Sequence, residues 1–166
     1  MIKGIILILS LWMINGLMAH FAGGHTLPPY RPPDTTRDVI TAYYSNQTYC
    51  VGPATLRVEF KEVVLQNCGT PGQQWKFNPS GSVSLAENYC LDIFGGSPKE
   101  NTPVIMYPCY NPPSANQLWR VEGNRIVSKL NGLCLTSLGP KLGLIMKPCN
   151  MASFSQFFNT PQLVQC

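Results

Sequence analysis

Side chains suited to ligand chemistry are concentrated in one stretch of the chain, residues 90–119. Its notable members, in order, are Cys90, Asp92, Gly95, Gly96, Tyr107, Cys109, Asn116, Gln117 and Trp119. Asp92 is the only aspartate after residue 48. A carboxylate accepts hydrogen bonds, a side-chain amide both accepts and donates them, and an aromatic ring offers an apolar face. Such a set suits the binding of a polar ligand that also has an apolar surface.

Catalysis is not expected from these residues. Both histidines, His20 and His25, precede all the cysteines, so the cysteine-containing region has no imidazole for a nucleophile–base pair or an ordinary zinc site. Glu87 and Asp92 are conceivable as a glycosidase pair, but no spacing argument places them across one bond. We therefore expect a protein that is not an enzyme and that uses neither a metal nor a cofactor.

The stretch around Asp92 is the best preserved of three repeated units. The first cysteines of the units are Cys50, Cys90 and Cys134, and the second are Cys68, Cys109 and Cys149. The units close with Gln73-Gln74-Trp75, Gln117-Leu118-Trp119 and Gln156-Phe157-Phe158. Each series advances by about forty residues, and internal periodicity of this kind constrains the architecture more strongly than any local signal.

The elements that must position these side chains are predicted to be short strands. Segments rich in apolar and β-branched residues alternate with Gly, Pro and Asn turns, without a convincing helical period after residue 48. The candidate strands are Leu56–Phe60, Val63–Leu65, Val104–Tyr107, Arg125–Ser128 and Gly143–Met146. With 166 residues the chain can bury one core. An all-β domain with threefold pseudo-symmetry follows.

Three units of this length, each closed by Gln-x-Trp or a close variant, resemble the ricin B-type lectins over roughly residues 49–160. The resemblance implies a β-trefoil. The aromatic residues Trp75, Trp119 and Phe158 would enter a shared core, and the amides of Gln73, Gln117 and Gln156 would bond to neighbouring backbone.

Within this frame the six repeated cysteines pair inside their units. The expected disulfides are Cys50–Cys68, Cys90–Cys109 and Cys134–Cys149, although sequence alone leaves the connectivity open. Cys166 is left over, either as an inert terminal thiol, as one half of an intermolecular disulfide, or as an alternative partner for one of the other six.

The resemblance also assigns a carbohydrate site to the middle unit. Asp92, Tyr107 and Asn116 match the family's sugar-binding positions, and Gln117 would orient Asp92 from behind. A sugar presents hydroxyl groups and an apolar C–H face, which a carboxylate, an amide and a ring can meet. The alternative is that Asp92 and Tyr107 serve only a turn and a strand.

The other two units lack this set. Their matching positions hold Gly52, Gln66 and Gly72 in the first unit, and Thr136, Lys147 and Ser155 in the third. Neither unit can therefore assemble the same site.

Two segments precede the predicted trefoil of residues 49–166. Residues 1–19 have a signal-peptide layout, with an uncleaved membrane anchor as the alternative, and the protein is expected to be secreted or periplasmic. Residues 20–48 hold a Pro-rich run and read as an extended arm, either flexible or lying across a partner through Tyr30, Tyr43 and Tyr44. Asn46 begins an Asn-Gln-Thr glycosylation sequence, which matters only in a eukaryotic secretory pathway.

The basic residues are scattered, despite a formal net charge of +4, so a nucleic-acid partner is not expected. A leader, a Pro-rich arm and one degenerate trefoil are similar to the two trefoil binding subunits of the cytolethal distending toxins. The leader has no lipobox cysteine, so the more similar of the two is the one without a lipid anchor. That similarity implies glycans and other toxin subunits, including a catalytic one, as partners at the host-cell surface. The alternatives are an independent secreted lectin and the carbohydrate-binding partner of a separate hydrolase.

Overall fold

The computed structural model describes residues 39–55, 61–85 and 88–161. Its strands are β1 (Thr41–Tyr44), β2 (Gln47–Pro53), β3 (Lys61–Gln66), β4 (Trp75–Phe77), β5 (Val83–Leu85), β6 (Tyr89–Ile93), β7 (Val104–Pro108), β8 (Trp119–Glu122), β9 (Arg125–Ser128), β10 (Cys134–Thr136) and β11 (Ile145–Lys147). Three single-turn 3-10 helices, η1 (Phe94–Gly96), η2 (Ala115–Gln117) and η3 (Phe154–Gln156), complete the elements. No α-helix occurs among the described residues, and the all-β prediction is confirmed. The predicted signal peptide, the candidate strand Leu56–Phe60 and Cys166 lie outside these residues.

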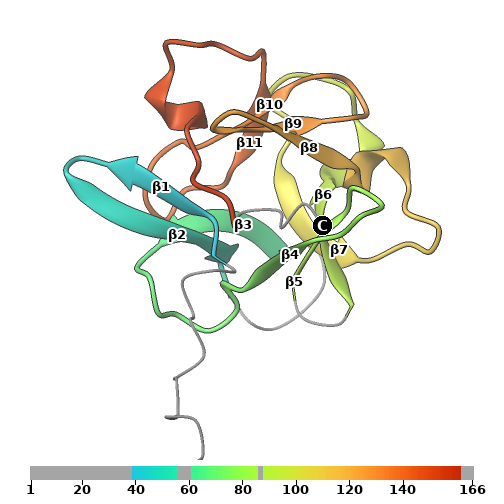
Figure 1. Cartoon of the computed structure of the whole chain (residues 1–166), viewed down its shortest axis with the longest axis horizontal. Helices are drawn as coiled ribbons and strands as arrows, with labels where there is room; N and C mark the ends of the chain where they lie inside the picture. The colour runs from blue at the N-terminus through green and yellow to red at the C-terminus, as the bar shows by residue number, and fades with distance from the viewer. Residues whose placement is uncertain (1–38, 56–60, 86–87, 162–166) are drawn as a thin grey trace, which may run out of the picture. The chain divides into compact units, whose positions relative to one another are not determined.

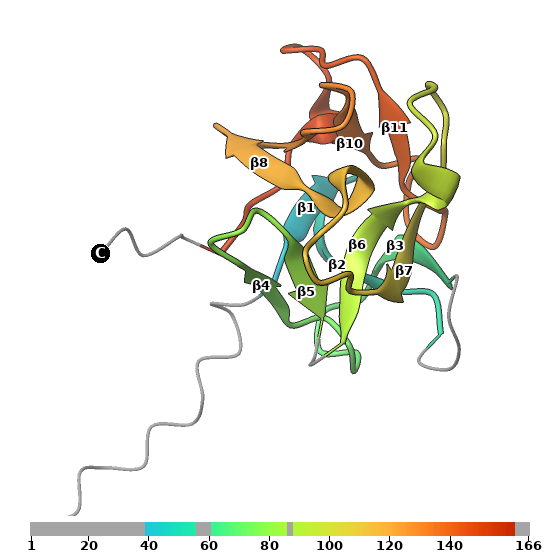
Figure 2. The same ribbon diagram turned by 90° about the vertical axis from the view of Figure 1, so that its right-hand side faces the viewer.

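The strands form two antiparallel sheets that are linked by isolated bridges. One sheet has the order β1-β2-β3-β7-β6-β5-β4, and the other has the order β11-β10-β9-β8. Single bridges link the sheets, for example between Val64 and Gly143 and between Pro103 and Ile145. Three groups of strands, coloured cyan to green, green to yellow and orange to red, consequently lie around a common centre (Figure 1). Figure 2 shows the same groups from the side.

The register of the second and third strands of each unit repeats three times. Gly52 pairs with Val64 in the first unit, Asp92 with Ile105 in the second, and Thr136 with Ile145 in the third. The first cysteine of each unit faces Gln66, Tyr107 and Lys147 in turn. The threefold pseudo-symmetry expected from the sequence interval is therefore present residue by residue in the strand pairing.

The closing motifs occupy the core as the repeat predicts. Trp75, Trp119 and Phe158 are at most 2% exposed. The indole N–H of Trp75 donates to the carbonyl of Val51 at 2.8 Å, and that of Trp119 donates to the carbonyl of Leu91 at 2.9 Å. A buried indole keeps its hydrogen bond in this way, whereas Phe158 has no donor to satisfy.

The structure contains the three disulfides that the repeat predicts. Cys50–Cys68, Cys90–Cys109 and Cys134–Cys149 have Cα–Cα separations of 4.9, 5.0 and 5.0 Å. Each bridge joins the second strand of its unit to the segment that follows the third strand. The bridges therefore hold the ends of equivalent hairpins together.

The folded domain begins about ten residues earlier than the sequence predicts. Within the predicted arm of residues 20–48, β1 pairs with β2 through a two-residue turn at Ser45 and Asn46, whose φ angles are 46° and 64°. Two positive φ angles are typical of the hairpin turns that match strand twist. Ile40 is fully buried, and Thr41 exchanges backbone hydrogen bonds of 2.9 and 2.8 Å with Asn159. Pairing with the last segment of the domain thus makes residues 39–48 part of the trefoil.

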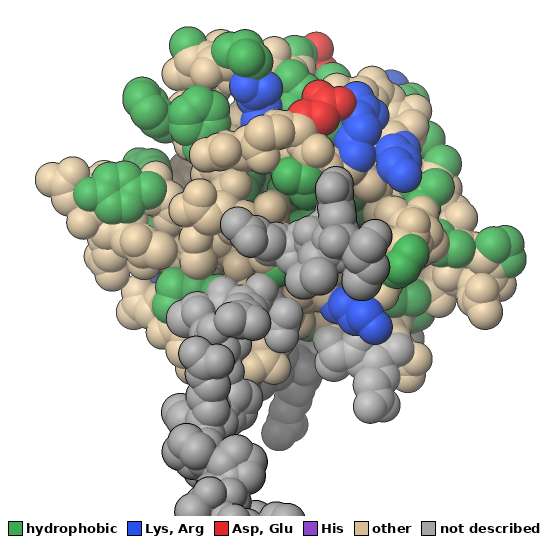
Figure 3. Space-filling view, viewed as in Figure 1, with side chains coloured by type: hydrophobic (Ala, Val, Ile, Leu, Met, Phe, Trp, Pro, Cys, Tyr) green, Lys and Arg blue, Asp and Glu red, His purple; other side chains and the backbone are tan. Residues whose placement is uncertain are grey.

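The same hairpin brings aromatic side chains to the surface. Tyr43, Tyr44, Phe154 and Phe157 line one shallow cavity of about 310 Å³ between the hairpin tip and η3, and we call these four residues the aromatic surface. Tyr43 is 63% exposed and Phe154 is 78% exposed. Hydrophobic side chains are visible at the left and upper left of the molecule, over the hairpin tip and η3 (Figure 3).

Candidate functional site

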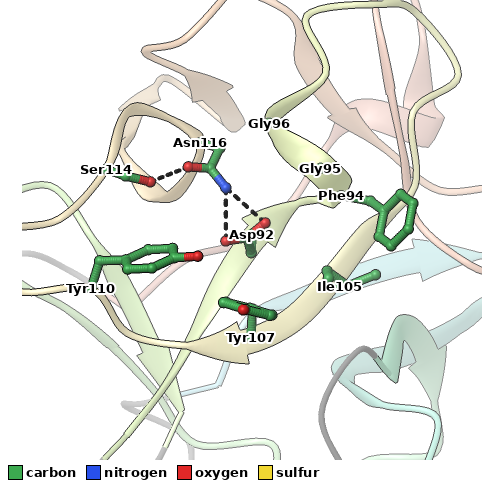
Figure 4. Close-up of a pocket in the computed structure, with 9 residues that line it drawn as sticks. All are labelled: Asp92, Phe94, Gly95, Gly96, Ile105, Tyr107, Tyr110, Ser114 and Asn116. Atoms are coloured by element: carbon green, nitrogen blue, oxygen red, sulfur yellow. Dashed lines mark hydrogen bonds between the residues drawn. The ribbon is translucent and has the colours of Figure 1, made fainter.

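Three of the four predicted site residues, Asp92, Tyr107 and Asn116, line one cavity of about 560 Å³ in the middle unit. Adjacent strands supply its floor, with Asp92 on β6 and Ile105 and Tyr107 on β7. Because alternate residues of a strand share a face, Ile105 and Tyr107 point to the same side. The helices η1 and η2 form the rim (Figure 4). The full lining is Asp92, Phe94, Gly95, Gly96, Ile105, Tyr107, Tyr110, Ser114 and Asn116.

Asp92 is held at the centre of the cavity by two neighbouring amides. The Nδ2 of Asn116 lies 2.9 Å from both carboxylate oxygens, and the Nε2 of Gln117 lies 2.8 Å from Oδ2. Asp92 is only 2% exposed, so a ligand reaches it through the cavity. A carboxylate has about four acceptor positions. The three contacts therefore leave acceptor capacity for a ligand hydroxyl.

Burial raises the pKa of Asp92 above its ordinary value of 3.8, because a charged carboxylate loses solvation there. The hydrogen bonds from Gln117 and Asn116 act in the opposite direction and favour the charged form. The two amides thus offset part of the cost of placing an acceptor in a half-enclosed pocket.

Asn116 is itself oriented by Ser114, whose hydroxyl donates to Oδ1 of Asn116. The Oδ1 atom of Asn116 consequently faces Ser114, and its Nδ2 atom faces Asp92. Because Nδ2 is equidistant from the two Asp92 oxygens, one N–H can be shared between them. The second N–H then remains for a ligand.

Gln117 is fully buried, lies outside the cavity lining and contacts Asp92 through its Nε2 atom. Its Nε2 also donates to the carbonyl of Pro108 at 2.9 Å, and its Oε1 accepts the backbone N–H of Tyr110 at 2.9 Å. Gln73 and Gln156 make the equivalent pair of backbone contacts in the other units. The backbone contacts of Gln117 therefore belong to the fold, and what the middle unit adds is a carboxylate as the side-chain partner of this glutamine.

Tyr110 and Phe94 line the cavity although the sequence does not single them out. The rings of Tyr107 and Tyr110 lie 5.6 Å apart at 34°. A hydrogen bond with Tyr107 raises the pKa of the Tyr110 hydroxyl. Both residues belong to loops or single-turn helices, where no periodic pattern marks a functional face. The only available signal is their closeness in sequence to Asp92 and Cys109.

The equivalent places in the other two units are occupied differently. A Cβ on Gly52 would lie 2.4 Å from Nε2 of Gln66, so the glutamine side chain fills the room that a side chain at residue 52 would need. That Nε2 atom is buried and has no hydrogen-bond partner among the described residues. In the third unit, Thr136 accepts the Nε2 hydrogen bond of Gln156 at 3.0 Å. Neither unit offers a carboxylate at this place.

For the described part of the chain, two questions are whether its side chains could bind a metal ion and whether any helix could cross a membrane. Residues 39–55, 61–85 and 88–161 include no cluster of His, Cys, Asp or Glu that could hold a metal ion. In the same residues no helix is long and apolar enough to cross a bilayer.

Several known proteins are similar to this chain. Tectonin-2 of Physarum polycephalum is 40% identical over 52 residues, which are 30% of this chain and 15% of that protein. A non-toxic homologue of type II RIPs from Momordica charantia, solved in complex with α-methyl-D-galactoside, superposes with a TM-score of 0.62 at 20% identity, covering 74% of this chain and 46% of that chain. The β-trefoil lectin of the Vibrio vulnificus hemolysin/cytolysin, solved with N-acetyl-D-lactosamine bound, has a TM-score of 0.58 at 18% identity, covering 77% and 96%.

The two structural similarities support the β-trefoil fold. The match to Tectonin-2 spans far less than two thirds of that relative's length. A family model for the ricin-type β-trefoil lectin domain matches residues 40–158. That range runs from the buried Ile40, just before β1, to the core residue Phe158 and includes all three disulfides. The chain therefore belongs to the ricin-type β-trefoil lectin family, whose domain binds carbohydrate and is not catalytic.

Proposed function

We propose that this protein binds glycans through the cavity of its middle unit. The observation that carries the proposal is the Asp92 carboxylate, which two amides hold at the base of an open cavity while it retains acceptor capacity. Hydroxyl groups of a sugar would donate to Asp92 and accept from Asn116. The apolar C–H face would pack on Tyr107, which lines the same cavity and lies diagonally across from Asp92 on the neighbouring strand.

One such site is expected to bind weakly. The cavity is open, and few ligand atoms would be fully desolvated in it. Single shallow sites of this kind have dissociation constants on the order of millimolar. Useful affinity would then come from several sites presented together, because linked sites bind with a high effective concentration.

The proposal is tested with two substitutions in the site. Asp92→Asn removes the charge and keeps the shape, and Tyr107→Ala removes the stacking ring. We expect both variants to lose binding on a glycan array and in calorimetry while circular dichroism and the unfolding temperature stay close to wild type. Glu100→Gln and Tyr43→Ala are the matched controls, because both residues are exposed and lie outside the cavity. Unchanged glycan binding in both site variants would contradict the assignment.

We further propose that the protein is the binding subunit of a secreted multi-component toxin, as its similarity to the binding subunits of cytolethal distending toxins implies. The aromatic surface supports this proposal, because exposed clustered rings are typical of protein–protein contacts. Three disulfides support secretion, because such bonds persist in oxidising compartments. Cys166 would supply an intermolecular disulfide.

Co-purification of the native protein with and without reductant tests this second proposal. A catalytic subunit that accompanies the wild type and is weakened by Tyr43→Ser with Phe154→Ser would support it. A partner released by reductant and absent from Cys166→Ser would assign the intermolecular disulfide. A monomer that binds glycans without any partner would instead identify an independent lectin.

A further inference from the structure

We propose that the middle-unit cavity binds the end of an oligosaccharide rather than a single sugar, with a second sugar resting on Phe94. This inference rests on the proposed glycan binding at Asp92. It adds a second subsite and a direction in which the bound chain leaves the protein.

The size of the cavity first indicates room for more than one sugar. A volume of about 560 Å³ lies within the range of roughly 300–1,000 Å³ that is typical of pockets for drug-sized ligands. A single pyranose is considerably smaller than such a ligand. The groups that would hold the first sugar, Asp92, Tyr107 and Asn116, occupy only the middle of the lining (Figure 4).

Tyr110 closes one end of the cavity. Its ring packs against Tyr107, and its backbone N–H is bonded to the fully buried Gln117. In Figure 4 its hydroxyl points toward Asp92, across the side of the cavity away from Phe94. A sugar in contact with Asp92 therefore meets an aromatic wall on that side.

Phe94 lies at the opposite end, with Asp92 between the two rings (Figure 4). Its backbone N–H donates to the carbonyl of Pro103 at 3.1 Å, while its side chain is 50% exposed. The exposed ring offers an apolar face at the height of the rim. A sugar that leaves the Asp92 subsite in this direction can stack on it.

The glycines that follow Phe94 keep the passage open. A Cβ placed on Gly95 would meet no atom within 4 Å, and one on Gly96 would only reach Asn116 at 4.0 Å. Their φ angles of 62° and 61° are values that side-chain-bearing residues adopt rarely. Open space therefore lies beside both glycines, and a bound chain can extend into it.

The test compares an oligosaccharide with its terminal sugar. The probes are the shortest oligosaccharide on the array that wild type binds and the methyl glycoside of its terminal sugar with the same anomeric configuration. For a β-galactoside these are N-acetyl-D-lactosamine and methyl β-D-galactoside. We expect wild type to bind the longer probe more tightly. Phe94→Ala should lower affinity for the longer probe by about three- to tenfold, the loss expected for one stacking contact, and leave the monosaccharide affinity unchanged.

Phe154→Ala is the matched control, since Phe154 is 78% exposed and lies in the third unit outside this cavity. Equal affinity of wild type for both probes, or a Phe94→Ala variant that binds the longer probe as wild type does, would overturn the second subsite. An equal loss for both probes would also overturn it. A wild-type protein that binds no array glycan, or an Asp92→Asn variant that binds normally, would overturn the proposed function itself.

Discussion

The carboxylate of Asp92 is almost completely buried, yet it lines a cavity through which a ligand can reach it. Burial disfavours its ionised form, and the amides of Asn116 and Gln117 favour that form. Gln117 makes the same backbone contacts as its counterparts in units without a carboxylate. The amide framework is therefore common to the fold, and the middle unit differs from the others in the side chains set around it, with Asp92 at their centre.

The raised pKa of Asp92 predicts that glycan binding weakens on acidification. The ligand hydroxyls need a charged acceptor, so affinity should begin to fall at a pH above the ordinary aspartate value of 3.8. Calorimetric titration from acidic to neutral pH measures this, and a constant affinity across that range would contradict it.

The raised pKa of Asp92 affects stability in the opposite direction: acidification weakens glycan binding but increases the contribution of Asp92 to the free energy of unfolding. Because the folded pKa exceeds the unfolded one, Asp92 binds its proton more tightly in the folded state. Its contribution to the free energy of unfolding is fully present below pH 3.8 and is lost as the pH rises through the folded value. Asp92→Asn should remove this component from the pH dependence, as measured by urea unfolding without ligand.

At the scale of elements, the site depends on the single-turn helices that connect its short strands. The strands β6 and β7 place Asp92 and Tyr107 diagonally across from each other in the floor of one cavity, but the rim comes from η1 and η2, each a single turn. Short turns have little stability of their own, and tertiary contacts fix their positions. The strand β1 shows the same dependence, because its pairing with Asn159 joins the two ends of the domain.

We predict that the domain requires residues 39–48. A chain of residues 39–166 should fold with the unfolding temperature of the longer protein, and a chain of residues 49–166 should not fold cooperatively. The shorter chain lacks β1 and the fully buried Ile40. As a milder test, Ile40→Ala should lower the free energy of unfolding by about 2–5 kcal/mol. Equal unfolding temperatures for the two truncated chains would contradict the boundary.

At the scale of the whole molecule, three similar units serve different ends. The middle unit carries the cavity around Asp92, whereas the third unit and the β1–β2 hairpin together carry the aromatic surface. Because the two surfaces are separate, the proposed glycan and the proposed protein partner would not compete for the same residues. All three units nevertheless share a disulfide at the equivalent place.

Removing one disulfide should therefore have different consequences in different units. Cys134→Ser with Cys149→Ser should lower the free energy of unfolding by about 3 kcal/mol and leave glycan affinity unchanged. Cys90→Ser with Cys109→Ser should cost a similar amount and also weaken binding, because these cysteines flank Asp92, Tyr107 and Tyr110 in sequence. Denaturant unfolding and calorimetry on the same samples measure both effects. Equal affinities for the two double variants would contradict the local role of Cys90–Cys109.

The sequence by itself determined the architecture and the centre of the candidate site. Motifs such as Gln117-Leu118-Trp119 recur with the cysteines at a constant interval, and equivalent sequence positions become equivalent strand positions in a repeated fold. The repeat alone did not join Asp92, Asn116 and Gln117 into one site; the resemblance to the ricin B-type lectins implied that grouping.

Only the tertiary structure decided where the domain begins and what surrounds Asp92. The strand β1 is defined by its pairing with β2 and with Asn159, at the far end of the chain, and the Pro-rich sequence before it masks the short alternation of Ile40 and Ala42. Tyr110 and Phe94 belong to turns, whose side-chain directions depend on remote contacts rather than on a local period. Gln66 fills the space beside Gly52 because the two lie on paired strands, which sequence spacing does not reveal.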